Sequence, residues 1–145
     1  MNALISWPTL SRRALHLVAL LAPLAVGAAD LRVTVVDGPA GPSTLYIALF
    51  DGAEAFDTTK SVAAQTLQAR EGGGQVAFLG LPVGRYALRM FADENGNGKL
   101  DTNLLGLPIE RYGFSNDARG TMGPPGFDAA AFRVDGDTAV TVHLR

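Results

Sequence analysis

The chain has 145 residues, of which 48% are hydrophobic and 18% are charged. This length suits one domain, and the composition is too apolar and too weakly charged for a disordered chain. Cysteine is absent, so we expect neither disulfide bonds nor a lipid anchor on an N-terminal cysteine.

Residues 1–29 have the features of a signal peptide. Arg12 and Arg13 supply a positive n-region, an apolar stretch follows at residues 14–26, and small residues precede Asp30. We therefore expect cleavage before Asp30 and export to the periplasm or the extracellular space. The alternative is a retained membrane anchor, but the stretch is shorter than the roughly 20 residues that span a bilayer. The paired arginines also partly match a twin-arginine signal, so the export route stays open.

The charge that remains after cleavage argues against a polyanionic partner. Without Arg12 and Arg13 the count of Lys and Arg falls from 12 to 10, against 14 Asp and Glu, which gives a net charge of −4. A phosphate backbone would be repelled overall. We therefore expect neither nucleic-acid binding nor a purely electrostatic attachment to an anionic membrane.

Apolar residues alternate with polar ones along much of the remaining chain, which is the period of half-buried strands. Residues 44–50 are apolar on both faces and predict a central strand. A single helical turn is expected near residues 53–56, and residues 61–69 fit either a strand or a helix. In chain order, we expect strands at residues 31–35, 44–50, 75–79, 85–91, 130–134 and 140–144.

Turns rich in Gly, Pro and Asp separate these strands. Six to eight short strands without a long helical period predict an all-β, antiparallel sandwich of immunoglobulin or prealbumin type, most simply with seven strands. Residues 30–145 would form this single domain. Residues 92–128 show no clear period, and we expect them to hold one long ordered loop.

That segment opens with the oxygen pattern of a calcium loop. Asp93, Asn95, Asn97 and Asp101 occupy its positions 1, 3, 5 and 9, and the backbone carbonyl of Lys99 would serve position 7. A hard cation takes six to eight oxygen ligands, and alternate residues of a tight loop can all face inward. The spacing therefore predicts one calcium ion bound by these five residues.

The predicted ligand set is incomplete. Position 12 is Leu104 rather than a bidentate Glu, so Asn103 or Glu110 would have to complete the shell or order the loop. Such a site would be weak, with a Kd of about 10⁻⁴–10⁻³ M, and would suit magnesium less well. The alternative interpretation is a polar turn that caps its own amides and binds no ion.

Longer motifs around the same loop resemble those of a known family. Residues 93–103 and 106–116, with residues 81–86 and 125–128, resemble the exported bacterial family known as Domain of Unknown Function 2141. The resemblance covers essentially the whole mature chain and implies an exported β-sandwich with no established activity. The turn at residues 81–86 is also similar to that of prealbumin-like and collagen-adhesin B-type modules, which supports the fold rather than a function.

The second half of the loop is mostly apolar. We expect this run to pack over a sheet face or a barrel end, because apolar runs in small domains are usually core. The alternative is a ligand surface for a sugar, a peptide or another small ligand, formed by Tyr112, Phe114 and Asn116. The apolar residues concerned are Leu104, Leu105, Leu107, Pro108, Ile109, Tyr112 and Phe114.

No catalytic constellation is evident. His143 is the only histidine after residue 29, which is too few for a zinc site, and there is no Gly-x-Ser-x-Gly motif. A hydrolase could use Asp93, Asp101 and Glu110 only if these carboxylates converged. We therefore expect a non-enzymatic, calcium-stabilised module of the cell envelope or exterior that binds a protein or a glycan.

Overall fold

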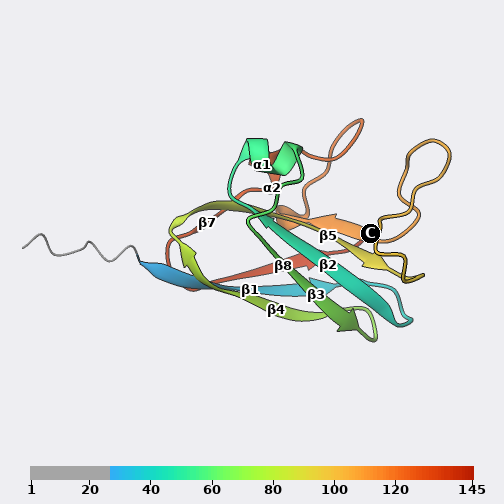
Figure 1. Ribbon diagram of the computed structural model, residues 1–145, viewed down its shortest axis with the longest axis horizontal. Coiled ribbons are helices and arrows are strands. Elements are labelled where there is room, and N and C mark those ends of the chain that lie inside the picture. The colour runs from blue at the N-terminus through green and yellow to red at the C-terminus, as the bar shows by residue number, and fades with distance from the viewer. Residues whose placement is uncertain (1–26) are drawn as a thin grey trace, which may run out of the picture.

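The computed structural model describes residues 27–145, which form two β-sheets and three short helices (Figure 1). The strands are β1 (Ala28–Val36), β2 (Ser43–Phe50), β3 (Ala63–Ala69), β4 (Gly74–Pro82), β5 (Gly84–Asp93), β6 (Tyr112–Phe114), β7 (Phe132–Val134) and β8 (Thr138–His143). The helices are α1 (Ala53–Asp57), the 3-10 helix η1 (Ser115–Asp117) and α2 (Phe127–Ala130).

The eight strands form a three-stranded sheet and a five-stranded sheet. The first has the order β4-β1-β8, and the second has the order β3-β2-β5-β6, with β7 also paired to β5. β6 pairs with residues 89–91 and β7 with residues 84–86, so the two short strands share one edge of β5. All pairs are antiparallel except β1 with β8. The predicted all-β sandwich is confirmed.

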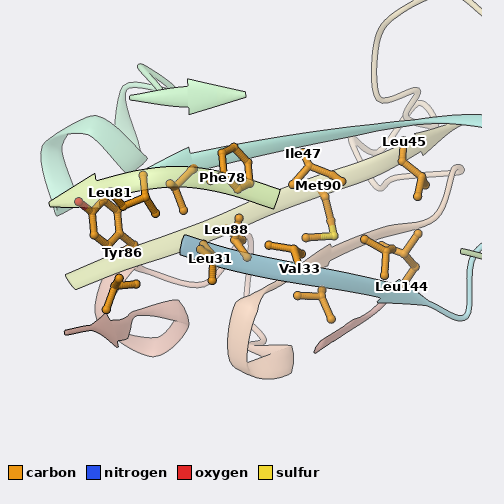
Figure 2. Packing of buried hydrophobic residues seen from close by; sticks show 14 of the residues in the cluster. Leu31, Val33, Leu45, Ile47, Phe78, Leu81, Tyr86, Leu88, Met90 and Leu144 are labelled. Carbon is orange, nitrogen blue, oxygen red and sulfur yellow. The ribbon is translucent and has the colours of Figure 1, made fainter. Parts of the chain in front are cut away.

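The main core lies between the two sheets (Figure 2). The alternation predicted for β1 and β5 places Leu31 and Val33 opposite Leu88 and Met90, and all four are at most 2% exposed. Full burial of one such side chain stabilises the fold by about 1.5–3 kcal/mol. Every strand and both apolar clusters come from residues 28–144, so the described part of the chain holds its own core.

A second apolar cluster covers the outer face of the five-stranded sheet, beneath α1 and α2. Phe50 and Phe56 meet edge to face, with ring centroids 5.2 Å apart. The guanidinium of Arg89 lies 4.5 Å from the centroid of the Phe56 ring and donates to the Phe56 carbonyl at 3.1 Å. This cluster explains why β2 is apolar on both faces: one face meets the main core and part of the other lies under α1.

The long loop expected at residues 92–128 is interrupted by β6 and η1 and ends in α2, and the structure also defines two other segments. Residues 61–69, which fitted either element, contain strand β3. The strand expected at residues 130–134 begins only at Phe132, because Ala130 ends α2. Strand β6 was not expected, since three residues containing a glycine show no alternation.

The expected signal peptide lies outside the described residues except at its end. Ala28 and Ala29 belong to β1, where they pair with Pro82 and Leu81 of β4, and Ala29 is 3% exposed. The first strand therefore starts two residues before the expected cleavage site.

Between Gly27 and Arg145, no helix has both the length and the apolar character needed to cross a membrane.

Candidate functional site

The candidate site is the connection between β5 and β6, which stands away from both sheets as the gold segment of Figure 1. It has two parts. We call residues 93–101 the polar loop and residues 102–109 the aliphatic tip. Strand β5 positions the polar loop, because its last residue, Asp93, is paired with Thr44 of β2 and is only 2% exposed.

The polar loop wraps around the carboxylate of Asp93. Its Oδ1 accepts the backbone N–H groups of Gly96 at 2.7 Å and Asn97 at 3.2 Å, and its Oδ2 accepts that of Gly98 at 2.7 Å. Gly96 and Gly98 have φ of +77° and +73°, a region that favours glycine. Burial opposes ionisation of this carboxyl group, but the surrounding N–H groups outweigh it and lower the pKa of Asp93.

Glu110 closes the polar loop from the other side. Its Oε1 accepts the N–H of Glu94 at 3.0 Å, and its Oε2 accepts the N–H of Asp101 at 2.9 Å. The residue is 7% exposed, so these two hydrogen bonds are largely shielded from water. One carboxylate thus joins the first and last turns of the polar loop.

Three of the predicted metal ligands meet at the outer side of the polar loop. The amide nitrogen of Asn97 lies 2.9 Å from both carboxylate oxygens of Asp101, and the amide nitrogen of Asn95 also donates to that carboxylate. The amide oxygens face inward instead: that of Asn97 accepts the N–H of Lys99, and that of Asn95 accepts the N–H of Asn97.

The donor set fits a hard cation in composition but not in its present orientation. Side-chain oxygens of Asn95, Asn97 and Asp101 are suitable ligands. The amide nitrogens, however, are the atoms that face Asp101, while Asp93 and Glu110 are engaged by backbone N–H groups. Within residues 27–145, no three His, Cys, Asp or Glu side chains are grouped to hold a metal ion.

Asn103 serves the aliphatic tip rather than the polar loop. Its Oδ1 accepts the N–H groups of Leu105 at 2.9 Å and Leu107 at 3.0 Å. A backbone bond from Asn103 to the Leu107 carbonyl and a bridge between Thr102 and Pro108 complete a small hairpin. The role of Asn103 here is to fold this turn.

The expectation that the apolar run packs as core is wrong for the aliphatic tip. Leu104 is fully exposed, and Leu105, Ile109 and Leu107 are 83%, 66% and 58% exposed. Phe114, by contrast, is buried in the cluster beneath the helices. The reason is geometric: the hairpin closed by Asn103 carries the tip away from the sheets before β6 returns the chain to them.

The three residues of the alternative ligand surface do not lie together on the outside. Phe114 is only 4% exposed. Tyr112 is half-buried, with the guanidinium of Arg145 lying 5.2 Å from its ring centroid. The amide of Asn116 donates to the carbonyl of Ala131 at 2.8 Å, so it holds the end of α2.

An Asp–His pair that the sequence did not indicate joins η1 to β8. His143 Nδ1 lies 2.8 Å from Asp117 Oδ2, and the His143 backbone N–H donates to Asp117 Oδ1 at 2.9 Å. That N–H and the His143 side chain lower the pKa of Asp117. The neighbouring Ser115 is not a third member, because its buried hydroxyl accepts from the Leu88 N–H and donates to the Ala130 carbonyl.

Comparison with known proteins gives a family and one distant structural likeness. Residues 33–143 match the family described as "Uncharacterized protein conserved in bacteria (DUF2141)". No curated protein matches the chain. Among solved structures, the chain is similar to a fimbrial assembly protein from Parabacteroides distasonis, with 12% sequence identity and a TM-score of 0.41. The match covers 81% of this chain but 52% of that one, so this chain spans about half the length of that protein.

Proposed function

The chain belongs to this family of uncharacterized bacterial proteins, and we propose that it is an exported, non-enzymatic β-sandwich whose polar loop binds one structural calcium ion. It acts as an interaction or accessory module of the cell envelope. The observation that carries the calcium proposal is the meeting of Asn95, Asn97 and Asp101 at one point, at positions 3, 5 and 9 of a calcium loop.

Calcium binding requires a local rotation of these side chains, which gives up the two backbone hydrogen bonds that the Asn95 and Asn97 amide oxygens accept. Rotating an Asn amide by a half-turn about its terminal bond exchanges its nitrogen and oxygen. After that rotation Asn95 and Asn97 present oxygens beside the Asp101 carboxylate. A calcium ion then takes the place of the two amide nitrogens next to that negative charge. Asp93 holds the loop closed through three backbone N–H groups, so the ligands are already gathered.

The non-enzymatic part of the proposal rests on the state of the polar groups. Asp93 accepts three backbone N–H groups, which lower its pKa and do not suit it to act as a general acid. Both carboxylate oxygens of Glu110 are occupied by backbone N–H groups of the loop. The Asp117–His143 pair has no hydroxyl partner from Ser115, whose bonds are internal to the fold.

The first experiment is a thermal melt of residues 27–145, stripped with a chelator and then titrated with calcium or magnesium. At free calcium of about ten times Kd we expect about 1.4 kcal/mol of stabilisation, or a rise in Tm on the order of 5 °C. Magnesium should have a smaller effect.

The matched variants are Asp101→Ala, which removes the carboxylate at the meeting point, and Asp135→Ala, an exposed aspartate paired with Arg133. The calcium-dependent rise should disappear in the first and persist in the second. Equal calcium shifts in both variants, or no shift in the wild-type protein, would rule the calcium site out and leave a polar loop that caps itself.

A further inference from the structure

The aliphatic tip places four large apolar side chains in water on a small, ordered hairpin. Scattered exposed apolar residues are ordinary, but Leu104, Leu105, Leu107 and Ile109 lie within six consecutive residues and are all more than half exposed. No charged residue occurs between Thr102 and Ile109. This concentration calls for an apolar partner outside the domain.

Most backbone N–H groups of the tip are paired within the hairpin. The N–H groups of Asn103, Leu105, Gly106 and Leu107 all donate within the hairpin, and Pro108 has none. Of residues 103–108, only Leu104 has an N–H without such an acceptor. Unsatisfied N–H groups would oppose transfer out of water, so this internal bonding removes most of the cost on the donor side. The carbonyls of residues 104–106 have no donor within the hairpin, which suits the hydrated interface of a bilayer rather than its hydrocarbon centre.

We infer that the aliphatic tip inserts into the interfacial region of a lipid bilayer. The inference goes beyond the proposed function and depends on neither calcium nor export. The tip is a projecting hairpin rather than a hollow, and a bilayer accepts such a shape without a complementary surface.

Size and composition favour lipid over a protein partner. Four aliphatic side chains offer at most a few hundred Å² of apolar surface, whereas a standard protein interface takes about 800 Å² from each partner. Binding hot spots between proteins are rich in Trp, Tyr and Arg and poor in Leu, and residues 102–109 contain none of the first three. Aliphatic insertion needs neither a large area nor those residues.

The only tryptophan of the chain is Trp7, so residues 27–145 contain none, and a single introduced indole reports on its own surroundings. The probe is the Leu105→Trp variant of residues 27–145, mixed with vesicles of phosphatidylethanolamine that contain a minor fraction of phosphatidylglycerol. Its matched control is Leu79→Trp, at a 73% exposed position on β4. Vesicles should shift the emission of the first variant to shorter wavelength, and bromine-labelled acyl chains should quench it. The control should not respond.

A second pair of variants tests the tip itself in the Leu105→Trp background. Leu104→Ser with Leu107→Ser should weaken partition into vesicles about tenfold or more, because each loses apolar surface that the bilayer would bury. Val62→Ser with Leu79→Ser, exposed apolar positions elsewhere, should leave partition unchanged. These sites are exposed, so a melt should show all variants folded.

Three results would overturn the inference. The first is an indole at position 105 that responds to vesicles no more than one at position 79. The second is self-association without lipid that the Leu104→Ser, Leu107→Ser pair abolishes, which would assign the tip to a second copy of the chain. The third is a protein partner lost with the same pair while vesicle binding is absent, which would assign it to a protein groove.

Discussion

The polar loop and the aliphatic tip follow one another directly, yet they reverse the usual distribution of side chains. In the polar loop the acidic Asp93 is turned inward and buried. Glu110, which follows the aliphatic tip in sequence, is also buried, and both carboxylates accept backbone N–H groups of the loop. In the tip, leucines and an isoleucine face solvent. The segment is ordered by hydrogen bonds to a few side-chain oxygens, and its apolar residues are left exposed to solvent.

Outside the apolar core, the largest loss of stability should come from removing the carboxylate that joins the two ends of the polar loop. Glu110→Ala leaves the N–H groups of Glu94 and Asp101 without acceptors in a shielded place. We expect a loss of about 2–3 kcal/mol in the free energy of unfolding, measured by urea denaturation. Glu94→Ala, at an exposed side chain, should change it by less than about 0.5 kcal/mol. Equal losses would show that Glu110 does not organise the loop.

A smaller effect on the free energy of unfolding is expected from Asp117, an exposed carboxylate that accepts a backbone N–H. The pKa of Asp117 is lowered in the folded state, so its stabilisation is present above the ordinary value of 3.8 and is lost as pH falls through the folded pKa. Asp117 and His143 are about half exposed, so the contribution should be below about 1 kcal/mol.

Asp117→Asn should therefore lower stability at pH 6 and converge with the wild type near pH 2, as followed by urea denaturation at each pH. A constant difference at every pH would mean that the charge of Asp117 is not what joins η1 to β8.

The smallest effect should come from the aliphatic tip. Leu104→Ser alters a fully exposed side chain that adds nothing to either apolar cluster, so the free energy of unfolding should change by less than about 0.5 kcal/mol. Leu88→Ala, in the main core, should cost about 2–5 kcal/mol in the same urea titration. A large loss for Leu104→Ser would mean that the tip packs against the domain in solution.

The strands could be predicted because their burial is periodic. The alternation of Leu31, Val33 and Val35, and of Tyr86, Leu88 and Met90, indicates which face meets the core, and all six are buried. The short β6 could not be found in this way, since it exists by pairing with residues 89–91 of β5, far away in sequence.

The candidate site was predictable in its spacing but not in its orientation. Alternating Asp and Asn residues indicated a loop with side chains on one side, and the structure brings Asn95, Asn97 and Asp101 together. The capping by Glu110 depends on the path of the whole connection, which no local pattern records. The exposure of the aliphatic tip likewise follows from the turn at Asn103, whereas its apolar composition alone predicted that it would be buried in the core.

If the chain is exported as proposed, the first residues of β1 would tie its processing to the order of folding. A peptidase needs an extended, accessible bond, whereas the bond between Ala29 and Asp30 lies within a strand paired to β4. The proposed cleavage would therefore have to come before β1 is incorporated into the sheet, so protease and folding would compete for the same few residues. The Asp30 nitrogen, now an amide 3.0 Å from the Asp137 carboxylate, would then be an ammonium group facing an opposite charge, and the new chain end would be held by the sheet.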